Sequence, residues 1–392
     1  MFEIQFSPIV ISLLVALIVS MVYLLTGFRG FIVSVGRRVR KDASKVLPEE
    51  EKYYPTVSVV VYAADDASNL EILLPQILEQ DYPAQFEVVV VNDGAALSTK
   101  DVIARLEQNY NNLYMTFTQA GSRSLSRKKL ALTLGVKASR FETIVVTMGN
   151  AQIPSRVWLK SLCRNFTPGI DVVIGYATPA SPEGTKERCK RLHAFDFVRT
   201  SVEYLSWAIA GRPYRGTCYN LAYRREVFFQ NKGFSRSLDL KYGDDDIFVS
   251  EVANSDNTVV ELSPDSMVLD VETNPSASFK TDKLRYDYTV RRIRNNARMY
   301  FSSCSWAWWI MLGSAIAAGV FGLPSFIPSI IAMLLVVVTM VTLMVVWKRT
   351  SLSLWSRPLF LTVPWFISFH PLYTLYYNIK GWRRRGDNKS WS

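Results

Sequence analysis

The stretch FEVVVVNDG (residues 86–94) decides the fold class of this 392-residue chain. Its run of valines shows no polar alternation, which is typical of a strand buried on both faces of a parallel sheet. A similar run, TVSVVVY, occupies residues 56–62, and apolar residues at helical spacing fill Leu70–Gln80 between them. Two more strands are predicted at residues 142–147 (ETIVVT) and 170–176 (IDVVIGY). This order predicts a Rossmann-like α/β domain whose mostly parallel sheet carries helices on both faces.

Polar or small residues follow three of these predicted strands. Asp65-Asp66 follows the first, Asn92-Asp93 the second and Met148-Gly149-Asn150 the third. Ligands of parallel α/β sheets bind outside the carboxyl ends of the strands. We therefore expect these three segments to line one crevice.

Two stretches without charge are long enough to cross a membrane: Ile9–Leu25 and residues 302–347. Nothing basic precedes the first and no cleavage site follows it, which favours an uncleaved anchor over a signal peptide. Gly322-Leu323-Pro324 divides the second stretch into spans over Trp306–Gly322 and Phe326–Trp347, which are predicted to form a hairpin.

The formal net charge of +11 does not predict a nucleic-acid partner. Much of the excess lies beside the apolar segments, at Arg37–Lys41, Lys348-Arg349 and Arg383–Arg385, where basic residues attract anionic lipids. The basic flank after the anchor predicts a cytoplasmic soluble region at the cell (inner or plasma) membrane. The last apolar segment, Leu352–Ile379, contains three prolines and is predicted to lie in the interface or re-enter rather than cross.

These segments divide the chain into five predicted regions. They are an anchor (1–28), a basic and acidic linker (29–53), a cytoplasmic α/β domain (54–301), a two-helix membrane hairpin (302–349) and an interfacial or re-entrant segment with a basic tail (350–392). The four cysteines and two histidines have no zinc-binding spacing. Scattered thiols fit a reducing compartment.

From Tyr54 to Phe301 the motifs resemble those of membrane-bound glycosyltransferases of family 2, inverting enzymes with the GT-A fold that include cellulose and hyaluronan synthases. In VVVNDGAALST (89–99), Asp93 matches an acid that contacts the nucleotide in that family. Asp66 matches an acid near its uracil, and Lys129, with Lys128 as the alternative, matches a lysine beside the base. The resemblance therefore implies a UDP-sugar or another nucleoside-diphosphate sugar as donor. Turn acids and a solvated helix face are the structural alternatives.

The strongest match is the segment GDDDIFVSE (243–251). The resemblance makes Asp245 the catalytic base, with Asp244 and Asp246 orienting or tuning it. The chemistry requires a carboxylate that takes the proton of the attacking acceptor hydroxyl. Like charges close together would raise the pKa of one acid toward neutrality. The structural alternative is an acidic cluster that only stabilises a helix N-terminus.

A basic segment, YTVRRIRNNARMY (288–300), resembles the family's Q-x-x-R-W motif. Arg291, Arg294 and Asn295 take the three defined positions, and Arg294 would hold the diphosphate of the donor through its planar guanidinium. A basic helix at the membrane interface is compatible with the same sequence. Asn295 in place of tryptophan, and the few membrane spans, argue against synthesis of a long polymer.

The metal-binding acids of the family are absent, because Met148 and Asn150 stand at the two aspartate positions. Mg²⁺ and Mn²⁺ prefer oxygen ligands, so Asn150 offers only a weak, degenerate site, to which Asp93 could add a carboxylate. In one interpretation the enzyme is active and metal-independent, with Arg291 and Arg292 supplying the missing positive charge. Its acceptor would be a lipid-linked molecule or a glycan in cell-surface polysaccharide or lipid-glycan synthesis. In the other, the chain is an inactive pseudo-glycosyltransferase that acts as a scaffold. The retained Asp245 favours the first.

Overall fold

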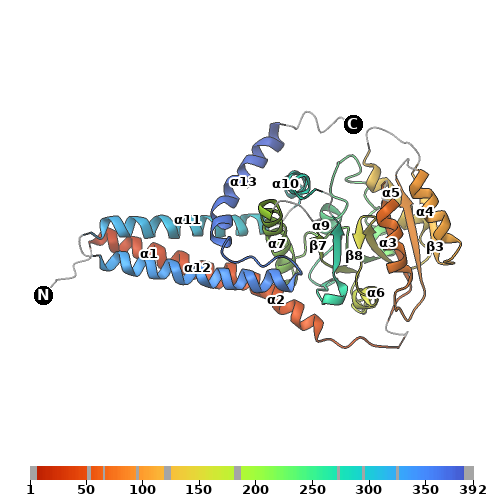
Figure 1. The fold of residues 1–392 in the computed structure, drawn as a ribbon, viewed down its shortest axis with the longest axis horizontal. Coiled ribbons are helices and arrows are strands. Elements are labelled where there is room, and N and C mark those ends of the chain that lie inside the picture. The colour runs from red at the N-terminus through yellow and green to blue at the C-terminus, as the bar shows by residue number, and fades with distance from the viewer. Residues whose placement is uncertain are drawn as a thin grey trace.

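The computed structural model describes residues 7–50, 54–64, 67–93, 97–118, 125–180, 187–271, 274–293, 296–323 and 326–383. A bundle of long apolar helices projects from one side of an α/β body (Figure 1). The chain enters the body from the bundle, builds the sheet and returns to the bundle near its C-terminal end.

The main sheet has seven strands in the order β3-β2-β1-β4-β8-β6-β9. Their bounds are β1 Val57–Ala63, β2 Phe86–Asn92, β3 Leu113–Phe117, β4 Thr143–Met148, β6 Val172–Ile174, β8 Leu221–Arg224 and β9 Thr258–Val260. β3, β2, β1 and β4 pair in parallel, whereas β8 runs antiparallel to both β4 and β6. The predicted α/β fold with a mostly parallel sheet is confirmed.

The strand register brings the predicted rim segments together. Ala63 pairs with Asn92, and Tyr62 pairs with Met148, so the carboxyl ends of β1, β2 and β4 lie at one edge. Asp65 and Asp66 lie outside the described residues. The other two segments lie at that common edge, as the sequence predicts.

Helices cover both faces of the sheet. Their bounds are α3 Ala67–Leu78, α4 Leu97–Glu107, α5 Arg127–Ala138, α6 Trp158–Cys163, α7 Glu187–Ile209, α8 Arg225–Gln230, α9 Asp246–Val252 and α10 Pro275–Val290. Val60 packs in the core that includes α5 and α7, whereas its neighbours Val59 and Val61 pack in the core that includes α3 and α6. Burial on both faces explains why the strand has no polar alternation.

A small second sheet adds a residue to the rim. It consists of β5 Ala151–Gln152, β10 Val268–Val271 and β7 Ala177–Ala180, in the order β5-β10-β7. β10 runs antiparallel to β5, with Asp270 opposite Ala151. This pairing places Asp270 beside the loop that ends β4.

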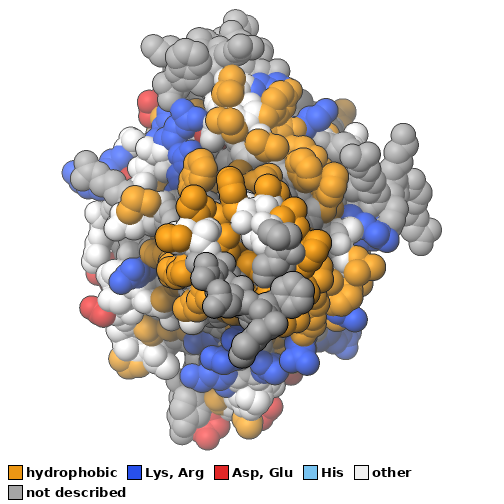
Figure 2. All heavy atoms as spheres, turned by 90° about the vertical axis from the view of Figure 1, so that its left-hand side faces the viewer, with side chains coloured by type: hydrophobic (Ala, Val, Ile, Leu, Met, Phe, Trp, Pro, Cys, Tyr) orange, Lys and Arg blue, Asp and Glu red, His pale blue; other side chains and the backbone are white. Residues whose placement is uncertain are grey.

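Within the described part of the chain, three helices are long and apolar enough to cross a membrane: Pro8–Ala43, Ala297–Phe321 (α11) and Ile327–Ser353 (α12). The first comprises α1 Pro8–Tyr23, a π-helical turn η1 Leu24–Phe28 and α2 Arg29–Ala43. α11 packs against both α1 and α12, so the predicted anchor and hairpin form one bundle. Seen from the end of the bundle, hydrophobic side chains cover it and Lys and Arg side chains surround them (Figure 2). These features indicate membrane association.

The first part of the predicted linker, Arg29–Ala43, forms α2, and Asp42 fixes the end of this helix to the body. The Asp42 carboxylate is fully buried and accepts from Arg38 Nε at 2.7 Å and from the backbone N–H of Leu262 at 3.1 Å. Lys45 Nζ lies 2.8 Å from its second oxygen. A buried carboxylate needs such partners. The membrane bundle is thus held in a defined orientation relative to the sheet.

The last apolar segment forms α13, Val363–Arg383, with Pro371 inside it. α13 leaves the axis of the bundle and runs past the body (Figure 1). It contacts α10 and α7 of the body and α11 and α12 of the bundle. An interfacial or re-entrant position remains the prediction for this helix.

Candidate active site

Three consecutive carboxylates, Asp244, Asp245 and Asp246, lie where α9 begins. Asp245 is the N-cap residue of α9, and its side chain accepts from the N–H of Asp246 at 2.8 Å. Gly243 precedes them with φ +101°, a backbone conformation that side chains disfavour. The three acids are only 4%, 3% and 0% exposed. Burial of this degree requires partners for each charge.

Each acid has its own cationic partner, and each partner comes from a different element. Lys128 Nζ of α5 lies 2.5 Å from Asp244, and Arg215 Nε lies 3.1 Å from Asp246. Arg285 of α10 forms an ion pair with Asp245. The cluster therefore combines three acids with three cations.

Neutral donors complete the cluster. Cys218 Sγ donates to Asp244 at 2.7 Å, and its backbone N–H donates to Asp245 at 3.3 Å. Thr289, one helical turn after Arg285 on α10, donates its hydroxyl to Asp246 at 2.7 Å. α10 thus presents two side chains to the acids on one face.

Burial and neighbouring charges give the three acids different pKa values. Burial alone would raise the pKa of Asp245, but Arg285 and Lys128 oppose it and hold that pKa well below its usual value. Burial would also raise the pKa of Asp244, but the charge of Lys128 opposes this effect and the pKa is lowered. Burial raises the pKa of Asp246 to about 7, and the adjacent Asp245 contributes. Two neighbouring carboxylates are ionised and the third is near its midpoint at neutral pH.

The acid cluster is continuous with the rim of the sheet. Lys128 lies 5.7 Å from the centre of the Tyr62 ring, and Tyr62 donates its hydroxyl to Asp93 at 2.8 Å. Asp93 is 7% exposed and also accepts from Thr118 at 2.5 Å and pairs with Arg127 at 3.1 Å. The predicted nucleotide residue Asp93 is thus linked to the acids through Tyr62 and Lys128.

The two adjacent lysines of α5 have different environments. Lys129 is fully buried, and its Nζ donates to three backbone carbonyls, those of Ser237, Leu240 and Tyr242. Burial lowers the pKa of Lys129 to about 8. The three N–H groups of the Lys129 ammonium therefore all donate to the loop that leads to the acids. Lys128, the alternative in the sequence, is the lysine at the acid cluster.

Asn150 lies at the rim beside a carboxylate that the sequence did not identify. Its amide nitrogen donates to Asp270 at 2.8 Å and to the hydroxyl of Tyr219 at 2.9 Å. Asp270 arrives from β10, more than a hundred residues later in the chain. The loop that lacks acids in its own sequence is therefore next to one in space.

A family model described as glycosyl transferase family 21 matches residues 10–387. This protein is a family 21 glycosyltransferase. Glycosyltransferase AglE of Haloferax volcanii is 26% identical over 132 residues, which are 33% of this chain and 42% of that protein. The match thus spans less than half of that relative. Family 2, the family named from the motifs, is not confirmed, although both assignments describe glycosyltransferases.

One solved structure supports the fold of this family 21 glycosyltransferase, and a second is more distantly similar. Mannosyltransferase PcManGT from Pyrobaculum calidifontis, in complex with GDP-Man and Mn²⁺, aligns with a TM-score of 0.54 and 18% identity over 94% of this chain and 99% of that one. S. aureus TarS 1–349, in complex with UDP-GlcNAc, aligns with a TM-score of 0.41 and 14% identity over 84% and 89% of the two chains. The first alignment supports a GT-A-like fold with the membrane helices included.

The predicted diphosphate arginines of this glycosyltransferase lie away from the acids in the described part of the chain. Arg291 makes a bidentate pair with Asp287 at 2.9 Å, and Arg292 stacks on Tyr288 at 3.9 Å from its ring centre. Arg294, like Asp66, lies outside the described residues. The arginines that do reach the acids are Arg285 and Arg215, which the motifs did not identify.

Both missed arginines left a weak signal in the sequence. Arg285 and Thr289 are four residues apart, as two side chains on one helical face would be. Arg215 lies in the same conspicuous block, RPYRGTCYN (212–220), as Cys218. Neither spacing identifies a partner by itself, because the partners come from elements distant in the chain.

The residues present fit Mg²⁺ or Mn²⁺ poorly. Cys218, Asp244 and Asp245 place ligand atoms within 4.8 Å of one another, which by geometry could hold an ion. However, Lys128 and Arg285 already neutralise these acids, and burial raises the pKa of the Cys218 thiol, a ligand that hard cations disfavour. Asp93 has both oxygens engaged. Asn150 with Asp270 offers one carboxylate and one amide.

Proposed function

We propose that this glycosyltransferase is active and inverting. It moves a sugar from a nucleoside-diphosphate sugar to a lipid-linked or glycan acceptor, with Asp245 as the base. The observation that carries the proposal is the Asp245 carboxylate, held ionised by Arg285 at the start of α9 and linked through Lys128 to the nucleotide edge of the sheet. An ionised carboxylate is the form that can accept a proton.

In the proposed single displacement, Asp245 takes the proton of the acceptor hydroxyl while that oxygen attacks the anomeric carbon. The bond from the anomeric carbon to the diphosphate breaks, and its electron pair leaves with the diphosphate. Arg285 and Lys128 then stabilise the departing charge. Before reaction, the diphosphate competes with Asp245 for Arg285. Loss of this partner raises the pKa of Asp245 and makes it a stronger base when the donor is in place.

The positive charge at the acids supports a mechanism that does not depend on a metal. The sequence assigned this role to Arg291 and Arg292, but Arg285 and Lys128 are the side chains that contact the acids. No step of the proposed mechanism passes through an ion. The complex of PcManGT with GDP-Man and Mn²⁺ makes Mn²⁺ the ion to test and GDP-sugars, beside UDP-sugars, the donors to test.

The membrane helices support a membrane-associated acceptor. The basic residues at the body end of α2 favour a cytoplasmic catalytic domain. Because Asp42 fixes α2 to the body, the sheet edge keeps one orientation toward the bilayer. This arrangement favours a substrate whose reactive group stays near the membrane surface.

The test is titration of the purified full chain with UDP, GDP and their sugars, in EDTA and in Mn²⁺. We expect binding in EDTA that falls about tenfold in Arg285→Gln, since one charge-assisted hydrogen bond is lost. Asp245→Asn should keep donor binding and lower the transfer rate roughly 10²–10⁴-fold, the usual contribution of a general base.

Binding only in Mn²⁺ would contradict the metal-independent mechanism. Absence of all nucleotide binding would contradict the transferase itself. That result would favour the scaffold interpretation, for which the absence of acids at residues 148–150 is the supporting observation.

A further inference from the structure

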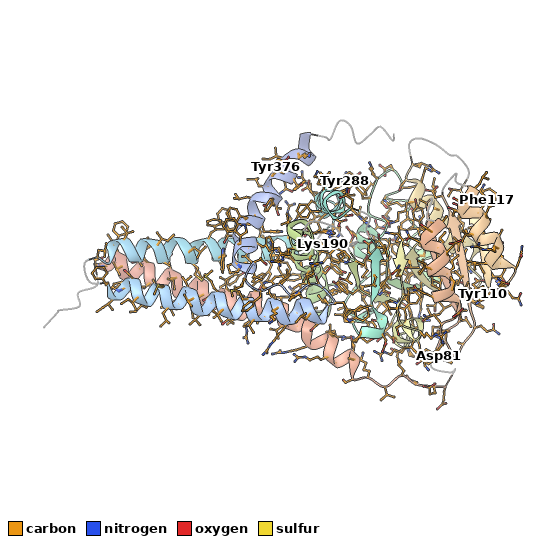
Figure 3. All side chains as sticks on the ribbon, viewed as in Figure 1. Asp81, Tyr110, Phe117, Lys190, Tyr288 and Tyr376 are labelled. Carbon is orange, nitrogen blue, oxygen red and sulfur yellow. The ribbon has the colours of Figure 1, made fainter. Side chains whose placement is uncertain are left out.

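A cavity of about 500 Å³ lies where the membrane bundle meets the body. Side chains from α7, α10, α11 and α13 line it. Figure 3 labels Tyr288 on α10 and Tyr376 on α13, two of the helices that contribute side chains to this lining. None of the three acids or their cationic partners lines this cavity.

The inner part of this cavity is charged and buried. Arg199 and Glu203 of α7 pair at 3.1 Å, and Lys283 of α10 pairs with Asp196. His370 of α13 lies 3.4 Å from the same Asp196 carboxylate. Burial, with Arg199 and Lys283 nearby, lowers the pKa of His370 and keeps it uncharged. These groups form a polar floor.

One cation of the lining is not balanced. Among the described residues, Arg298 makes no ion pair, whereas Arg199 and Lys283 each have a carboxylate partner. Arg298 lies in the first turn of α11, where the helix dipole also favours an anion. Arg298 is exposed, so the cavity offers an unpaired cation to a ligand.

The outer part of the cavity is apolar. It is bordered by Trp306 and Trp309 of α11, which are 69% and 42% exposed, and by Leu372 and Leu375 of α13, which are 54% and 55% exposed. Both tryptophans follow Arg298 along α11, where this helix enters the predicted membrane span. Indole rings favour this depth, the interface between bilayer and water. An unpaired arginine beside an apolar mouth matches a ligand with an anionic head and a hydrocarbon chain.

α10 connects the cavity to the acid cluster. Arg285 and Thr289 point to the acids, while Tyr286 of the same helix lines the cavity and donates to Glu203 at 3.3 Å. The ring of Tyr286 lies 4.8 Å from Arg215, the partner of Asp246. A helix with its side chains is about 10 Å across. A head group in the cavity and a hydroxyl at Asp245 thus lie on different sides of α10.

We propose that this cavity binds the acceptor and that the acceptor is a lipid phosphate bearing a sugar. The phosphate is bound by Arg298, and the hydrocarbon chain leaves between Trp306 and Leu375. The reacting hydroxyl belongs to the attached sugar, which reaches past α10 to Asp245, and not to the phosphate itself. This inference rests on the proposed transfer reaction for the identity of the ligand as acceptor.

The test measures binding of a radiolabelled polyprenyl phosphate, and of the corresponding polyprenol, to the full chain in nanodiscs of zwitterionic phosphatidylcholine. Arg298→Gln should weaken binding of the phosphate about tenfold and leave the polyprenol unaffected. Trp306→Ala should weaken binding of both lipids. Arg349→Gln removes an exposed cation at the end of α12, outside the cavity, and should change neither.

Equal binding of the phosphate and the polyprenol would overturn the proposal, as would an equal loss in Arg298→Gln and Arg349→Gln. Phosphatidylglycerol added to the nanodiscs separates the two sources of a lipid phosphate. If it displaces the polyprenyl phosphate at an equal concentration, the cavity holds bulk phospholipid and the acceptor assignment is wrong. Nucleotide titration of the same sample tests the transfer reaction separately, so failure of either proposal is visible without the other.

Discussion

The adjacent lysines Lys128 and Lys129 allow a sharp test of the site, because the structure gives them opposite roles. Lys128 pairs with Asp244 and is 21% exposed at its side chain, whereas Lys129 is buried and donates to three backbone carbonyls. We expect Lys129→Met to lower stability and to leave nucleotide affinity unchanged. We expect Lys128→Met to lower nucleotide affinity and to cost less stability.

The size of the Lys129 effect follows from its contacts. Three carbonyls lose their donor, and an unsatisfied buried group costs about 1–3 kcal/mol. The fall in the pKa of Lys129 from 10.5 to about 8 corresponds to a cost of roughly 3 kcal/mol for burying its charge. Methionine avoids this cost. The three carbonyls together cost roughly 3–9 kcal/mol, so after relief of roughly 3 kcal/mol the net loss ranges up to roughly 6 kcal/mol and Tm should fall. As the pH rises, Lys129 loses its proton at about pH 8 in the folded state but only at about pH 10.5 in the unfolded state. The stability of the wild type relative to Lys129→Met should therefore rise between these two pH values.

For Lys128→Met, one charge-assisted contact to the donor diphosphate is lost, which corresponds to about a tenfold weaker Kd. Asp244 retains Arg285 at 3.7 Å and the Cys218 thiol, so the cluster remains partly balanced. The assay combines thermal unfolding in detergent with titration of UDP and GDP for both variants. The reasoning is refuted if Lys129→Met weakens nucleotide binding more than Lys128→Met at an unchanged Tm.

Three more changes test the fold and the charge balance. Gly135→Ala should destabilise by about 1–3 kcal/mol, because its Cβ would lie 2.5 Å from Val60 Cγ1, whereas Gly30→Ala, with nothing within 4 Å, should be neutral or stabilising in thermal unfolding. Asp42→Asn should lower Tm by weakening the attachment of α2, at a cost of about 3 kcal/mol, and proteolysis should then cut first near the end of α2. Donor affinity should fall as pH rises through about 7, where Asp246 ionises, and titrations of Asp246→Asn across pH should give a flatter profile.

Much of the fold could be predicted because its signals are local. The valine runs identified the parallel strands, and the rule that strand ends share an edge was enough to group Asn92, Asp93 and Asn150 at one rim. The antiparallel β8 was not predicted: it is four residues long and is stabilised by pairing with β4 and β6. A strand of this length carries too few residues for a periodic signal.

The site was less predictable because its contacts join distant segments. Asp245 was identified from its motif, but its partner Arg285 comes from a helix forty residues later. The choice between the two lysines depends on which side of α5 faces the loop after Ser237, and the sequence carried both as alternatives. The carboxylate of Asp270 reaches Asn150 only through the pairing of β10 with β5.

The acids missing from the rim and the cations present at α9 belong to one charge balance. Lys128, Arg285 and Arg215 bring three positive charges to Asp244, Asp245 and Asp246, but the pKa of Asp246 is raised to about 7. Near neutral pH the protonated fraction of Asp246 leaves the cluster with an excess of positive charge. In the proposed reaction the anionic diphosphate would meet preorganised cations, which is the contribution that a divalent ion makes elsewhere. A rim carboxylate at residue 148 would oppose that attraction, so the absence of the acid pair and the presence of Arg285 are consistent with a single mechanism.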